Sequence, residues 1–134
     1  MAASTRAPGL TLGTNQSQTL NEAVAVFDVS LADETELAAT KTETALDLGA
    51  PGILSLKLDV TAASGTSPTL DAVVKTSADD GATDTYRTAA TFTQATGVTS
   101  ERQSFIVDRW VKLALTIGGT TPKFTFTANG QIKR

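Results

Sequence analysis

The chain has 134 residues, a formal net charge of -3, and neither histidine nor cysteine. A chain of this length forms one domain and can bury roughly two-thirds of its surface on folding, so it needs no metal or disulfide to fold. The lack of cysteine excludes disulfides, thiolate nucleophiles and thiolate metal sites. The eleven basic residues are scattered along the sequence, which argues against a nucleic-acid partner, because phosphate binding needs clustered Lys and Arg.

The sequence also lacks the signals of membrane insertion and of export. No run of about eighteen apolar residues occurs, so we expect no membrane-spanning segment and no membrane partner. The first nine residues contain no apolar core of a signal peptide. We therefore expect a protein that is made in the cytoplasm and is not exported by that route.

Residues 1–22 indicate an N-terminal arm in front of a β-sandwich domain, residues 23–134. Small and polar side chains dominate the arm, and Leu10, Leu12 and Leu20 are its candidate anchors. One interpretation is a frayed terminus. The other is an arm that orders against a neighbouring subunit, because Leu10 and Leu12 have the period-2 spacing of an added strand.

Alternation of apolar and polar residues predicts about eight strands in the rest of the chain. In the clearest of them, residues 53–61, Leu54, Leu56 and Leu58 point one way while the polar residues between them point the other. The expected strands cover residues 23–29, 40–48, 53–61, 70–74, 85–93, 102–107, 109–117 and 122–128. Residues 30–39 fit either a short helix or a turn that leads into the next strand, and the turn is preferred.

Turn-forming residues separate these strands, at residues 49–52, 64–68, 79–81, 96–97 and 118–119. The last of these turns makes the final two strands a predicted hairpin. No helical pattern alternates with the strands, so a parallel sheet is disfavoured. The pattern predicts an all-β fold, an antiparallel β-sandwich of jelly-roll or immunoglobulin-like topology.

The sequence offers little chemistry. Asp79, Asp80 and Asp84 surround Gly81 and could bind calcium, but the EF-hand spacing is missing, which favours a solvated turn. Nucleophilic catalysis needs a base beside the nucleophile, and no histidine is present to supply it. We therefore predict no enzyme activity and no catalytic, cofactor-binding or metal-binding residues.

The single tryptophan, Trp110, faces away from the side on which Val111 and Leu113 lie. It covers the edge of the sandwich, stacks against a sugar, or anchors an interface, a role in which aromatic residues are enriched. Arg109 beside it suits an interface equally well. The candidate interface residues are Leu10, Leu12, Leu20, Arg109 and Trp110.

Residues 52–129 resemble a small virion-protein domain of tailed-phage structural genes. The phrases that carry the resemblance are residues 56–71 (LKLDVTAASGTSPTLD), 75–77 (KTS) with the Asp-Asp-Gly turn, 92–94 (FTQ), 109–113 (RWVKL) and 119–126 (GTTPKFTF). The domain is similar to capsid decoration, or cement, proteins of tailed bacteriophages. The phrases that carry the resemblance are strands and turns, not a catalytic signature.

This resemblance implies a structural virion protein that binds the outer capsid surface and stabilises the mature head by bridging capsid subunits. Its partner would be the major capsid protein, and it would form a homo-oligomer, a dimer or a trimer. It would lie on the capsid surface after synthesis in the host cytoplasm, and the family has no catalytic residues to carry over.

Two alternatives stay open. One is a tail or fibre module that binds a host carbohydrate or receptor, although a chain that is about 5% aromatic offers a poor stacking platform. The other is a head–tail joining or tail-tube protein.

Overall fold

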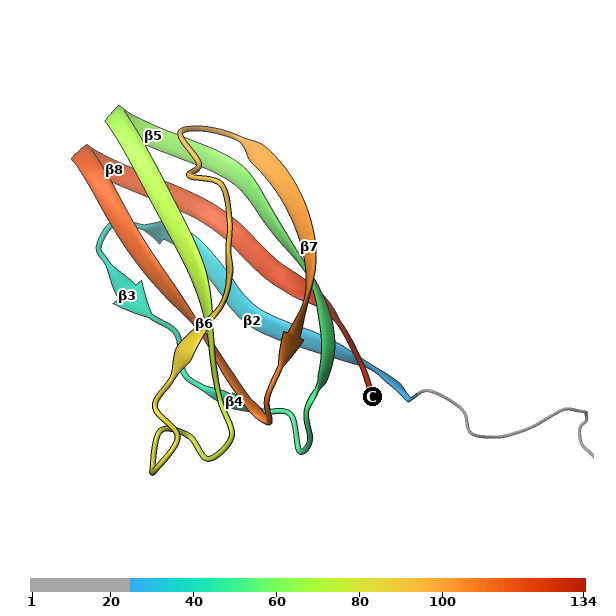
Figure 1. Cartoon of the computed structure of the whole chain (residues 1–134). Helices are drawn as coiled ribbons and strands as arrows, with labels where there is room; N and C mark the ends of the chain where they lie inside the picture. The colour runs from blue at the N-terminus through green and yellow to red at the C-terminus, as the bar shows by residue number, and fades with distance from the viewer. Residues whose placement is uncertain (1–24) are drawn as a thin grey trace, which may run out of the picture.

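The computed structural model describes residues 25–134, which form seven strands of one antiparallel sheet (Figure 1). The strands are β2 (Val26–Leu37), β3 (Lys41–Thr42), β4 (Leu46–Asp47), β5 (Gly52–Ser77), β6 (Arg87–Thr91), β7 (Thr99–Val107) and β8 (Trp110–Lys133). The antiparallel β-sandwich expected from the sequence is confirmed. The predicted arm, with Leu10, Leu12 and Leu20, lies outside the described residues.

Two long strands, β5 and β8, organise the sandwich. They pair antiparallel over almost their whole length, from Ile53 opposite Lys133 to Ser77 opposite Trp110. Both strands bend at the same corner, so that the sheet folds over itself (Figure 1). The first layer contains β2, the C-terminal part of β8, the N-terminal part of β5, and β7. The second layer contains β3, β4 and β6 around the other parts of β5 and β8.

Two matching tetrapeptides make the corner, Gly-Thr-Ser-Pro from Gly65 and Gly-Thr-Thr-Pro from Gly119. The two glycines have φ angles of 107° and 108°, and the third residues, Ser67 and Thr121, have 48° and 45°. A Cβ on Gly65 would lie 2.6 Å from the carbonyl oxygen of Thr121, and one on Gly119 would lie 2.7 Å from that of Ser67. The corner is therefore locally symmetric, and each glycine leaves room for the other strand's backbone.

The corner corrects two predictions. The expected loop at residues 64–68 and the expected turn at 118–119 are bends inside continuous strands. The predicted final hairpin is wrong, because both parts of β8 pair with β5 and not with each other. The breaker residues were placed correctly, but two residues of positive φ in each strand redirect the strand without ending its ladder.

The first strand is also longer than predicted. It continues through the expected turn, and β2 reaches Leu37 after two register irregularities, one after Ser30 and one after Glu34. Bulges of this kind add local twist and re-aim side chains while pairing continues. The polar sequence of this stretch belongs to an edge strand, one side of which faces solvent.

The inward positions of both layers form one core. The predicted inward residues of β5 and β8 are almost fully buried, including the two late phenylalanines, except Ile117, which is partly buried. The almost fully buried ones are Leu54, Leu56, Leu58, Val60, Leu70, Ala72, Val74, Val111, Leu113, Leu115, Phe124 and Phe126. Because the core fills the space between the layers, any binding surface has to lie on an outer face or at an end of the sandwich.

Candidate functional site

The outer face of the first layer carries the clearest candidate site. Strand register places its outward residues in rows that cross β2, β8, β5 and β7 in that order. The row at one end contains Val26, Lys133, Ile53 and Ile106. The three aliphatic residues of this row are 48%, 51% and 74% exposed. We call it the apolar row.

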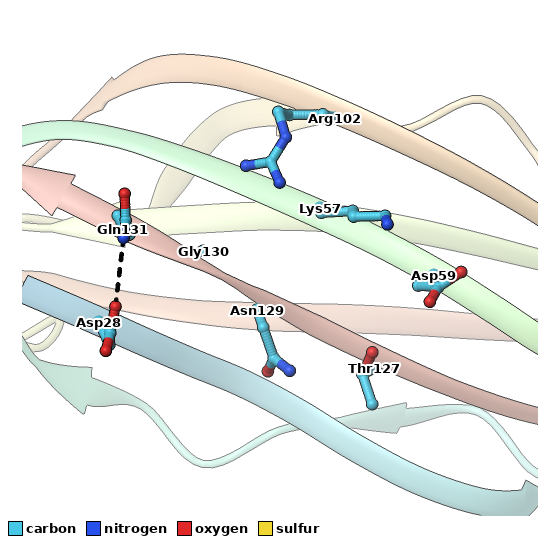
Figure 2. A pocket seen from close by; sticks show the side chains of 8 residues that line it. All are labelled: Asp28, Lys57, Asp59, Arg102, Thr127, Asn129, Gly130 and Gln131. Atoms are coloured by element: carbon cyan, nitrogen blue, oxygen red, sulfur yellow. Dashed lines mark hydrogen bonds between the residues drawn. The ribbon is translucent and has the colours of Figure 1, made fainter.

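A polar depression of about 470 Å³ lies beside the apolar row. The residues that line it are Asp28, Lys57, Asp59, Arg102, Thr127, Asn129, Gly130 and Gln131 (Figure 2). The Gln131 amide donates a hydrogen bond of 3.4 Å to Asp28, and Nη1 of Arg102 donates one of 3.3 Å to Ser55. Cationic donors, carboxylate acceptors and amides therefore face outward together, and such a surface suits a polar partner.

Gly130 on β8 contributes bare backbone to this depression, opposite Leu56 on β5. A Cβ there would lie 1.8 Å from the carbonyl oxygen of Ser55, so only glycine fits. This site is not apparent from the sequence, because its residues come from four strands that are far apart in the chain. The one sign of this site in the sequence is that Lys57 and Asp59 point outward in the alternating strand of residues 53–61.

Of the predicted interface residues, Trp110 begins β8 and Arg109 directly precedes it, where β4 joins the second layer. Arg109 binds Asp47 through two hydrogen bonds of 2.7 Å, from Nε and Nη2. This guanidinium, together with the amide of Gly49, lowers the pKa of Asp47 to about 2. Trp110 is partly buried, with the Arg109 guanidinium 5.9 Å from its ring. Arg109 thus fastens β4 to β8, and its charge is already paired.

The aspartate loop after β5 is held together by its own carboxylates. Asp79 accepts hydrogen bonds from the backbone amides of Thr83 and Asp84, at 2.9 and 3.0 Å. Asp84 in turn accepts one of 2.7 Å from the amide of Ala78. Asp79 also accepts a hydrogen bond from the Thr83 hydroxyl, and this bond, together with those from the two amides, lowers the pKa of Asp79 to about 2. The geometry is that of a self-capped turn.

A pair of carboxylates with a lysine lies between β2 and β3. Lys41 binds Glu34 at 2.5 Å and Glu43 at 3.6 Å. Burial, and then the hydrogen bond with Glu34, raise the pKa of Glu43 to about 7, while the same hydrogen bond lowers the pKa of Glu34. Two neighbouring carboxylates share one proton more easily than they both ionise.

Residues 25–134 contain no cluster of three or more His, Cys, Asp or Glu side chains placed to hold a metal ion. Over the same residues, no helix is long and apolar enough to cross a membrane.

Comparison with known proteins gives a structural likeness and no sequence family. No model of a known protein family matches the chain, and no curated protein sequence does. Among solved structures, a chain of the T13 viral particle of infectious bursal disease virus (IBDV) is 16% identical, with a TM-score of 0.52. A chain of the T=1 particles derived from that virus is 15% identical, with a TM-score of 0.47.

Each likeness covers 96% of this chain but only 35% and 36% of the two viral chains. The chain thus spans about a third of the length of these viral proteins. At 16% identity and a TM-score of 0.52, the first likeness shows a shared β fold.

Proposed function

We propose that this chain is a structural protein of a tailed-phage virion, which binds the outer capsid surface and bridges capsid subunits. The observation that carries the proposal is the fold that it shares with a chain of a viral particle. The resemblance of residues 52–129 to decoration proteins supports it independently. A compact sandwich with an outer face that is polar in its centre and apolar at one end fits a protein whose work is contact with other proteins.

Bridging explains how such a protein stabilises a head. A ligand that binds the assembled shell, and not its separated subunits, raises the free energy needed to pull the subunits apart. Several modest contacts on linked modules add up to a strong attachment. The sandwich supplies a rigid body, and the major capsid protein is the proposed partner.

The test is co-sedimentation of the purified chain with mature capsids of its virus that have been stripped of outer proteins. Saturable binding at a fixed ratio to the major capsid protein is the expected result. A folded chain that does not bind the capsids contradicts the proposal. Ring-shaped assemblies in electron micrographs would instead indicate the head–tail joining or tail-tube role.

The N-terminal arm gives a more specific prediction. Under the proposed function, Leu10, Leu12 and Leu20 dock onto a neighbour or the shell. Deletion of residues 1–20 should therefore abolish capsid binding while the sandwich keeps its circular dichroism spectrum and thermal transition. The matched control is the full-length chain with Thr11 and Thr14 changed to Ser, which keeps the leucines. Retained binding by the truncated chain would refute the docking role of the arm.

A carbohydrate-binding role on a tail or fibre is favoured by one observation, the polar depression with its carboxylates and amides. Hydroxyl-rich ligands bind such groups, but no aromatic residue lines this depression to stack against a sugar ring. Binding of host-surface glycans that is lost in Asp59→Ala and Asn129→Ala would support this second role.

A further inference from the structure

We propose that the outer face of the first layer is the contact between two copies of this chain, related by a twofold axis that runs parallel to its strands. The inference does not rest on capsid binding. It rests on the order of residues across the face and on the charges that the fold leaves unpaired there.

The apolar row matches itself under this symmetry. Its order across the face is Val26, Lys133, Ile53 and Ile106. A twofold axis between β8 and β5, along the strands, reverses the order of the row in the second copy. Val26 then faces Ile106 of the second copy, and Ile53 faces the methylene stem of Lys133 of the second copy. Exposed aliphatic surface of this kind gains free energy when a partner removes it from water.

The charges of the face also match themselves. Two aspartates lie on β2, Asp28 beside the apolar row and Asp33 further along, with Ser30 between them. The row that contains Ser30 continues across Asn129 on β8 and Lys57 on β5 to Arg102 on β7. Reversal of this row sets Arg102 of one copy opposite Ser30 of the other, between the two aspartates. An isologous contact requires such self-complementarity.

These charged groups have no ion pair within the described residues. Neither Asp28, Asp33 nor Arg102 takes part in a salt bridge there. Near the second layer the situation is the opposite, since Arg109 pairs with Asp47 and Arg87 with Asp108. The fold therefore leaves opposite charges unpaired on one face, at the two edge strands where a second copy would bring them together.

The direction of the axis follows from the same rows. A twofold axis across the middle of the face, in its plane but perpendicular to the strands, would exchange the two ends of the face. The apolar row would then meet the row that holds Asp33, Thr127 and Asp59, and aliphatic side chains would be buried against carboxylates. The axis parallel to the strands keeps the apolar row against itself and sets Arg102 of each copy between Asp28 and Asp33 of the other.

Cross-linking of introduced cysteines tests the contact directly, because the chain has no cysteine of its own. The double variant Val26→Cys/Ile106→Cys, in the full chain, should give cross-linked dimers with a short bifunctional thiol reagent, because facing sheets pack about 10 Å apart and a direct disulfide needs Cα atoms within about 7 Å. Within one chain the two positions lie three strand spacings apart, about 14 Å, which a short reagent does not span. The matched control is Val26→Cys/Val98→Cys. Val98 is about as exposed as Ile106, at 72%, but lies just before the other end of β7.

A charge exchange tests the same contact without a covalent bond. Sedimentation equilibrium should show a dimer of the unmodified chain at about 100 µM. Asp28→Arg alone and Arg102→Asp alone should each raise the dissociation constant about tenfold or more, and the double variant should restore it. Both side chains are exposed, so unchanged thermal transitions will confirm that the variants fold.

Four results would overturn the proposal. They are a monomer at that concentration, a trimer, equal trapping in the control, and no rescue by the double exchange. A monomer in which Ile106→Cys resists alkylation would show that another part of the same chain covers the face, which also excludes the dimer contact.

Discussion

At the scale of single residues, the corner depends on glycine at two symmetric positions. Gly65 and Gly119 have positive φ, a conformation that side chains disfavour, and each faces carbonyl oxygens of the other strand. Ser67 and Thr121 also have positive φ, so the bend stores strain that the pairing of β5 with β8 has to offset.

Gly65→Ala should therefore lower the free energy of unfolding by about 2 to 4 kcal/mol, since the new Cβ meets backbone and the φ angle is strained. Urea denaturation measures this change. Gly97→Ala is the control, because a Cβ at Gly97 would have no neighbour within 4 Å. Equal stability of the two variants would mean that the corner tolerates a side chain.

Glu43 makes stability depend on pH. Its pKa is about 7 in the folded chain and 4.5 in its ordinary state, so the folded chain binds the extra proton between these values. Stability therefore falls as pH rises from about 4.5 through 7. Glu34, whose pKa is lowered, contributes the opposite slope below its ordinary value of 4.5.

Glu43→Gln should remove the decline above pH 4.5, because the amide can donate to Glu34 as the protonated acid does. At pH 8 the variant should be more stable than the unmodified chain by about 1 to 2 kcal/mol. Urea denaturation at pH 5 and pH 8 measures both slopes. Glu101→Gln is the control: the Gln103 amide lowers the pKa of Glu101, so this change should leave the decline between pH 5 and pH 8 in place.

At the scale of elements, the short strand β4 depends on side chains more than on its own ladder. It pairs with β8 through only two residues, Leu46 and Asp47. Three further contacts hold it: the Asp47–Arg109 pair, the amide of Leu48 bound to the Arg109 carbonyl at 2.7 Å, and the carbonyl of Leu48 bound by Arg134. A strand this short gains little from backbone pairing alone.

Arg109→Ala should therefore loosen β4, and amide hydrogen exchange at Leu48 should become several-fold faster. Lys123→Ala is the control, since Lys123 pairs with Glu36 at the corner end of the first layer. In the unmodified chain, the same loosening should grow as pH falls from about 4 towards 2, because Arg109 lowers the pKa of Asp47 from 3.8 to about 2 and the stabilisation from this shift is lost over that range. Unchanged exchange in the variant would show that backbone pairing alone holds β4.

The sequence predicts correctly those features that depend on neighbouring residues along one strand. Period-2 alternation identified the inward faces of β5 and β8 residue by residue, because burial on one side of a strand leaves that pattern in the sequence. The corner was mistaken for two turns, because glycine and proline mark a bend and an end alike. The repeated Gly-Thr-(Ser/Thr)-Pro was the overlooked signal that both strands bend together.

The outer-face site could not be predicted, because it depends on which strands are neighbours. Asp28, Lys57 and Arg102 come together only through the register of β2, β8, β5 and β7. Arg109 and Trp110 were predicted to be interface residues, but the pairing of Arg109 with Asp47 on β4 is not visible in the sequence. The interface role of Leu10, Leu12, Leu20, Arg109 and Trp110 stays a prediction.

At the scale of the whole molecule, the two layers share their central strands. Because β5 and β8 pass through both layers, the central strand pair of one layer is continuous with that of the other. The core is also continuous between the layers. Separate sheets joined by loops could open one at a time, whereas this arrangement couples them.

The sandwich should therefore unfold as one cooperative unit. Leu58→Ala in the first layer and Leu113→Ala in the second each remove a fully buried side chain and should each cost about 2 to 5 kcal/mol. In both variants, the slowest-exchanging amides of β5 should lose equal amounts of protection from hydrogen exchange on the two sides of the corner, because they exchange only through global unfolding. Protection that falls only in the layer that carries the substitution would instead show two independently unfolding halves, and the bend would then be a hinge between them.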